Sequence, residues 1–90
     1  MTLLEAVRDF ESLDQMSTIF AAEPFSEHSE VIISEETESE IAPKWAVERG
    51  LTYFLEVFIV RELLDDWITD KEPTLLEKCR RIIQYAINDA

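Results

Sequence analysis

The stretch STIFAAEPFSEHSEVIIS, residues 17–34, predicts two β-strands joined by a short loop. Its first part, residues 17–22, is rich in β-branched and aromatic side chains, which favour strands. Pro24 ends that strand, because proline cannot donate a hydrogen bond to a neighbouring strand. A second strand is expected at residues 30–34, and the intervening PFSEH suits a hairpin loop. The segment therefore predicts an antiparallel β-hairpin.

The residues before the hairpin, TLLEAVRDFESL (2–13), predict a helix. Thr2 and Glu5 form the pattern T-x-x-E, in which each side chain can accept a hydrogen bond from the backbone N–H of the other. Apolar residues then recur on one face of the expected helix. We therefore expect an N-terminal helix that packs against the hairpin.

The second half of the chain predicts helices only. PKWAVERG (43–50) indicates a short helical turn that ends at Gly50, the single glycine. LTYFLEVFIVRELLDDWITD (51–70) is expected to form the longest helix. Thr74 and Glu77 repeat the T-x-x-E pattern before a last helix, whose apolar residues recur at i, i+3 and i+4. The short KEP connection predicts an αα-hairpin, and the whole pattern predicts the α+β class: N-terminal helix, antiparallel β-hairpin and C-terminal helical part.

The expected long helix has apolar residues on nearly every side of its first half. One face is the natural seat for the last helix and carries Tyr53, Val57, Val60, Leu64 and Trp67. A second apolar face is formed by Leu51, Phe54 and Phe58. A helix that is apolar all round must be buried. The cover could come from the hairpin and first helix, or from a second copy of the chain that binds at the second face.

The chain has a formal net charge of −12, and most of it lies in one segment. Residues 9–43 hold ten acids and no lysine or arginine, whereas residues 44–90 hold nine acids and seven bases. Part of this segment, at about 35–42, is expected to be a mobile acidic connection within a single small domain of residues 1–90. Such a charge disfavours nucleic acid and anionic membranes as partners. A basic protein surface is the partner that it would attract.

The acids proposed to bind a basic partner come from three parts of the chain. They are Glu27 and Glu30 in the hairpin, Glu35, Glu36, Glu38 and Glu40 in the connection, and Glu62, Asp66 and Asp70 at i, i+4 spacing. The last three oppose their own helix, because like charges at that spacing repel. Lys78 and Arg81 of the last helix are expected to compensate them. The alternative is that the acids only keep the surface solvated.

No catalytic or cofactor-binding pattern is present in the sequence. His28 is expected to be an exposed loop residue, and Cys79 falls on the apolar stripe of the last helix, where it would pack as a small hydrophobe. The glutamate run lacks the turn glycine of calcium loops, and one glycine excludes phosphate-binding glycine loops. We therefore expect no enzyme activity, no cofactor and no metal.

The composition favours a soluble cytoplasmic protein. One cysteine cannot form an intramolecular disulfide, the N-terminus does not read as a signal peptide, and no apolar run is long enough for a membrane span. The predicted function is a small acidic binding or regulatory protein that occupies a basic surface of a partner protein. The alternative is a homo-oligomeric structural protein whose acids serve solubility. Immunity proteins, antitoxins and inhibitors are analogies of charge and size only.

Overall fold

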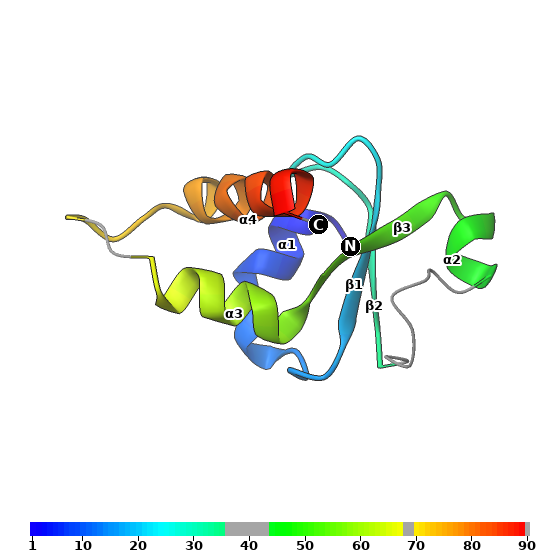
Figure 1. Cartoon of the computed structure of the whole chain (residues 1–90), viewed down its shortest axis with the longest axis horizontal. Helices are drawn as coiled ribbons and strands as arrows, with labels where there is room; N and C mark the ends of the chain where they lie inside the picture. Colours follow the sequence, from blue (N-terminus) through cyan, green and yellow to red (C-terminus); the bar gives the residue numbers. More distant parts are fainter. Residues whose placement is uncertain (36–43, 68–69, 90) are drawn as a thin grey trace.

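A three-stranded antiparallel sheet with strand order β2-β1-β3 forms the centre of the fold (Figure 1). The structure, a computed structural model, describes residues 1–35, 44–67 and 70–89. The predicted hairpin is confirmed: β1 (Thr18–Ala22) pairs with β2 (Val31–Ser34), with Phe20 opposite Ile32. The α+β class is confirmed as well. The acidic connection at 36–42, with Glu36, Glu38 and Glu40, lies outside the described residues.

The N-terminal helix α1 (Leu3–Arg8) forms as predicted, and a short 3-10 helix η1 (Phe10–Ser12) follows it. The Thr2 backbone N–H donates to Glu5 Oε1 at 2.8 Å, and the Glu5 N–H donates to Thr2 Oγ1 at 3.3 Å. This bond from the Thr2 backbone is the main reason why the pKa of Glu5 is lowered. The chain before α1 lies against the edge of β2, since the Val31 N–H donates to the Met1 carbonyl.

The predicted helix over residues 51–70 is wrong in its first six residues. Leu51–Glu56 forms strand β3, which pairs antiparallel with β1 on the side away from β2. Gly50, at φ +73°, ends the short helix α2 (Lys44–Glu48) and turns the chain into β3. The pairing skips Phe54, which is an extra residue in β3 opposite β1. Because of this bulge, Phe54 and Leu55 both pack in the same core, and the alternation typical of a strand is lost.

Two helices follow β3, and they are the C-terminal pair that the sequence predicts. Helix α3 (Val57–Asp65) and helix α4 (Leu75–Asp89) contact each other and run in opposite directions (Figure 1). The connection between them is longer than the predicted KEP, because α3 ends at Asp65. Helix α4 packs against α1 as well as α3, so the helical pair is closed by a third helix. The capping box of Thr74 and Glu77 is confirmed. The Thr74 N–H donates to Glu77 Oε1 at 2.9 Å, and the Glu77 N–H donates to Thr74 Oγ1 at 3.1 Å.

The helices divide unequally between the two faces of the sheet. Helices α1, α3 and α4 cover one face, where Leu3, Phe54, Val60 and Ile82 are buried in a single core. Helix α2 covers the other face, where Ala46 and Trp45 pack on Phe20, the ring of Trp45 meeting that of Phe20 edge-on at 5.5 Å. Figure 1 shows α2 at one end of the molecule and α3 and α4 extending to the other.

Candidate functional site

The outer side of α3 carries one aromatic ring and three carboxylates. We call Phe58, Glu62, Asp65 and Asp66 the α3 stripe; all four are exposed, Phe58 by 39%. They share a side because residues three and four apart are neighbours on a helix surface. Val57 and Val60, on the opposite side of the same helix, are buried in the core. The core therefore fixes the direction in which the stripe faces.

Within the described residues, the carboxylates of the α3 stripe form no ion pair. The last turn of α3 contains no basic residue, so the carboxylates lie at the negative end of the helix dipole. No ion pair joins Glu62, Asp65 or Asp66 to a base among residues 1–35, 44–67 and 70–89. Arg61, the one base in α3, lies over the ring of Phe10 instead, with 5.5 Å between its guanidinium carbon and the ring centroid.

An exposed apolar spot lies at the first turn of α3. The Val57 N–H donates to the carbonyl of Ser17 at 2.9 Å, so the backbone that precedes β1 at Met16 lies beside the first turn of α3. Met16 is 68% exposed. The α3 stripe thus has carboxylates at the end of the helix and exposed apolar side chains at its start. Protein interfaces combine apolar and polar residues in a similar way.

A groove of about 450 Å³ lies beyond the last turn of α3. It is lined by Phe10, Glu11, Leu64, Asp65, Trp67, Asp70, Lys71, Glu72, Pro73 and Lys78. Lys78 lies 3.3 Å from Glu72, and one side of the Trp67 ring is occupied by Arg81, at 4.9 Å from the ring centroid. Carboxylates outnumber bases among the lining residues, so the groove extends the negative surface of the α3 stripe.

The acids predicted from the sequence do not all lie together. Glu62, Asp66 and Asp70 lie on α3 or after its end, with Asp70 in the groove. Glu27 and Glu30 lie in the connection between β1 and β2, where Glu27 Oε1 is 3.9 Å from Arg80 of α4. Glu35 follows the end of β2 and is exposed. The predicted compensation of Asp66 by Lys78 or Arg81 is wrong, since Lys78 pairs with Glu72 and Arg81 lies over Trp67.

The expected dimer face of Leu51, Phe54 and Phe58 is not a continuous surface. Leu51 is 5% exposed and Phe54 is 0% exposed, both within β3 and covered by the same chain. The ring of Phe25 meets Phe54 edge-on at 4.8 Å and forms part of that cover. Of these three residues only Phe58 is exposed, and it lies in the first turn of α3, after the end of β3.

Several members of the candidate site were not identified from the sequence. Met16 and Glu11 reach it from the segment before β1, and Trp67 and Glu72 reach it from the connection after α3. No local pattern identifies Met16 and Glu11 as neighbours of α3, because they lie far from α3 in the sequence. The part of the site that the sequence does indicate is the pair Glu62 and Asp66, through their i, i+4 spacing on a helix.

Nucleophilic and metal chemistry have little support among the described residues. His28 is exposed in its loop, and Cys79 is 0% exposed, as predicted. Burial raises the pKa of the Cys79 thiol from 9.0 to about 11, and the nearby carboxylate of Glu27 adds to this effect. Within the described ranges, no three His, Cys, Asp or Glu side chains are grouped closely enough to hold a metal ion. The same part of the chain contains no helix long and apolar enough to span a membrane.

The chain matches no family model, no curated protein and no solved structure.

Proposed function

We propose that the protein is a small non-enzymatic binding protein that occupies a basic surface of a partner protein, and that it does so through the α3 stripe. The observation that carries the proposal is the placement of Glu62, Asp65 and Asp66. Three exposed carboxylates lie at the end of a helix where they oppose its dipole, and no base in the described chain compensates them.

Lysines and arginines of a partner would supply the missing compensation. Each carboxylate near a helix C-terminus costs roughly 0.3–1 kcal/mol, and the cost falls as salt screens it. A cation brought to the α3 stripe removes that cost. The carboxylates therefore destabilise the free protein and favour its complex with a basic partner. Phe58 and Met16 add apolar surface beside the charges. The net charge of −12 would steer a basic partner toward the protein.

The same charge argues against two other partner classes. Nucleic acid and anionic membranes both require a cationic surface, and the bases of α4 are few and partly engaged with Glu27, Glu72 and Trp67. We expect the partner to be met in the cytoplasm, because a single buried cysteine gives the chain no disulfide to gain from an oxidising compartment.

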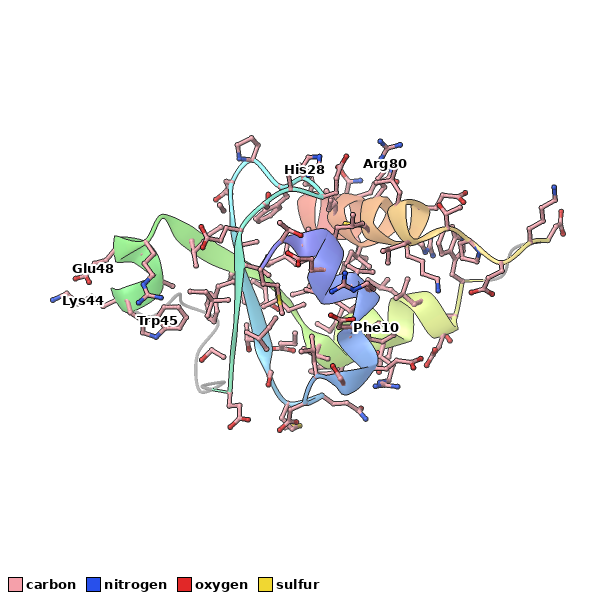
Figure 2. The ribbon with its side chains drawn as sticks, turned by 180° about the vertical axis from the view of Figure 1, so that it is seen from behind. Phe10, His28, Lys44, Trp45, Glu48 and Arg80 are labelled. Carbon is pink, nitrogen blue, oxygen red and sulfur yellow. The ribbon has the colours of Figure 1, made fainter. Side chains whose placement is uncertain are left out.

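The test is capture of partner proteins from the native cell extract at low and at high salt. The variant Glu62→Gln/Asp65→Asn/Asp66→Asn removes three charges from the α3 stripe. The matched control Glu23→Gln/Glu30→Gln/Glu48→Gln removes three exposed charges elsewhere; Figure 2 shows Glu48 at the end of the molecule away from Phe10.

We expect one basic protein to be captured by the wild type at low salt, to be retained by the control, and to be lost with the stripe variant. Capture by the wild type should fall steeply at high salt, because the attraction between exposed charges is screened. Equal loss with both variants would show that only total charge matters. Full capture by the stripe variant would contradict the proposal.

A further inference from the structure

A second groove, of about 340 Å³, lies between the β1–β2 connection and α4. Its lining residues are Phe25, Ser26, Glu27, Arg80, Ile83, Gln84, Ile87 and Asn88. Its apolar wall is anchored, because Phe25 packs on Phe54 and Ile83 belongs to the core. Ile87 at the rim is 61% exposed. An exposed isoleucine beside an apolar groove is a surface that gains from being covered.

The charge around this groove is balanced, unlike that of the chain as a whole. Among the described residues that line it, only Glu27 and Arg80 are charged, and their side chains lie 3.9 Å apart. Figure 2 shows Arg80 on α4 beside the loop that carries His28. Because the groove holds one charge of each sign, it can be complementary in charge to the same groove of a second copy. A second copy of this chain carries a charge of −12, and it meets the least repulsion at a neutral patch.

We propose that this groove is the contact between two copies of the chain, related by a twofold axis across their α4 helices. In such a contact the same patch serves both copies. Ile87 of each copy enters the groove of the other and covers Phe25 and Ile83 there. Each Arg80 then lies near Glu27 of both copies, so the charges sum to zero. The amides of Gln84 and Asn88 carry both donors and acceptors and can bond to their own counterparts.

The dimer goes beyond the proposed function and does not depend on it. In Figure 1, helix α4 and the β1–β2 connection lie together in the upper part of the view, and α3 lies below them. Two copies joined through α4 would therefore present two α3 stripes to partners. Binding of a basic protein with two sites would gain from the second stripe.

The test is sedimentation equilibrium over a range of protein concentrations, with Ile87→Glu compared with Phe58→Glu. We expect the wild type to form a dimer and Ile87→Glu to raise its dissociation constant at least about tenfold, since burying an isoleucine side chain stabilises by more than this ratio requires. Ile87→Lys should do the same although it makes the chain less negative. Phe58→Glu should dimerise as the wild type does. Circular dichroism checks that each variant folds.

The salt dependence of dimerisation is a second test, and its direction can be predicted. The dimer should strengthen as salt is raised, because the repulsion between two acidic copies is screened, whereas capture of a basic partner should weaken. A wild type that stays monomeric at its highest soluble concentration overturns the proposal. So does a dimer that is lost with Phe58→Glu and kept with Ile87→Glu, or one that dissociates as salt is raised. A failed capture experiment would leave all of these outcomes unchanged.

Discussion

The helices α3 and α4 contact each other but differ in their N-caps and in the charges near their ends. Helix α4 begins with a complete capping box at Thr74 and Glu77, and its buried stripe includes Cys79, Ile82 and Ala86. Helix α3 has Glu56 at its N-cap with no side-chain hydrogen bond. It ends in carboxylates that oppose its dipole. The two helices thus differ at their N-caps and in the number of carboxylates near their C-termini, although neither has a base in its last turn.

This difference between α3 and α4 indicates which helix to test for partner binding. The cap and the apolar stripe of α4 both favour the helix, whereas the carboxylates on the outer side of α3 oppose the dipole of their own helix. Natural proteins commonly accept such local costs at their functional sites. We therefore propose that the α3 stripe, and not α4, binds a basic partner, and the predictions below test that distinction.

The largest expected effect comes from truncation of the α4 core. Ile82 is 0% exposed, so Ile82→Ala should lower the free energy of unfolding by about 2–5 kcal/mol, through lost burial and the cavity that remains. Phe58→Ala on the α3 stripe should cost clearly less, about 1 kcal/mol, because Phe58 is partly exposed. Chemical denaturation measures both. Equal losses would break the distinction between the two helices.

The next effect concerns the two N-caps. Thr74→Ala removes the side-chain acceptor that caps α4 and should cost about 1 kcal/mol. Glu56 has the extended backbone of an N-cap, with φ −78° and ψ 148°, so Glu56→Asp should supply the missing cap and raise stability by a fraction of that amount. Thermal unfolding of both variants gives the comparison. A loss of stability in Glu56→Asp would mean that Glu56 has a structural role in β3.

A smaller effect, of opposite sign, is expected at the end of α3. Glu62→Gln/Asp65→Asn/Asp66→Asn should raise the free energy of unfolding by about 0.5–1 kcal/mol at low salt, since it removes charges that oppose the dipole and one another. The gain should shrink as salt is added. In the control Glu23→Gln/Glu30→Gln/Glu48→Gln, only Glu48 lies at the end of a helix, and there it lies 3.9 Å from Lys44, so a smaller gain in stability is expected. Destabilisation of the stripe variant would show that these acids support the fold.

A last effect, absent at neutral pH, is a pH dependence of stability that belongs to α4. The pKa of Cys79 is raised from 9.0 to about 11 in the folded protein, so folding favours the protonated thiol. Its contribution to stability is full below pH 9 and is lost as the pH rises toward about 11. Cys79→Ala should remove this alkaline loss. Alkylation of the wild-type thiol at pH 8 should require unfolding, and rapid labelling of the native protein would show that α4 opens easily.

The sequence was sufficient where local rules decide the structure. Thr2 with Glu5 and Thr74 with Glu77 are capping boxes readable from four residues, and both form. The hairpin of β1 and β2 is also a local structure, with strand residues on both sides of a short loop. In each case the partners are close in sequence, so the pattern contains all the information that the element needs.

Strand β3 could not be read in the same way. Its partner β1 lies about thirty residues earlier, and the bulge at Phe54 destroys the alternation that identifies a strand. The apolar residues of 51–56 then resembled the buried half of a helix. The spacing of Glu62 and Asp66 was readable because they lie on a true helix. Met16 and Glu11 were not, because only the pairing of β3 with β1 brings them to α3.

The most direct test of the account is a map of the binding site by NMR. The captured basic partner is added to the isotope-labelled protein, and changes in backbone amide shifts are followed by residue. We predict that the largest changes fall on Phe58, Glu62, Asp65 and Asp66, and that they disappear in the stripe variant. Changes confined to the β1–β2 connection around Glu23 and Glu30, with α3 unaffected, would contradict the assignment of α3 as the binding helix.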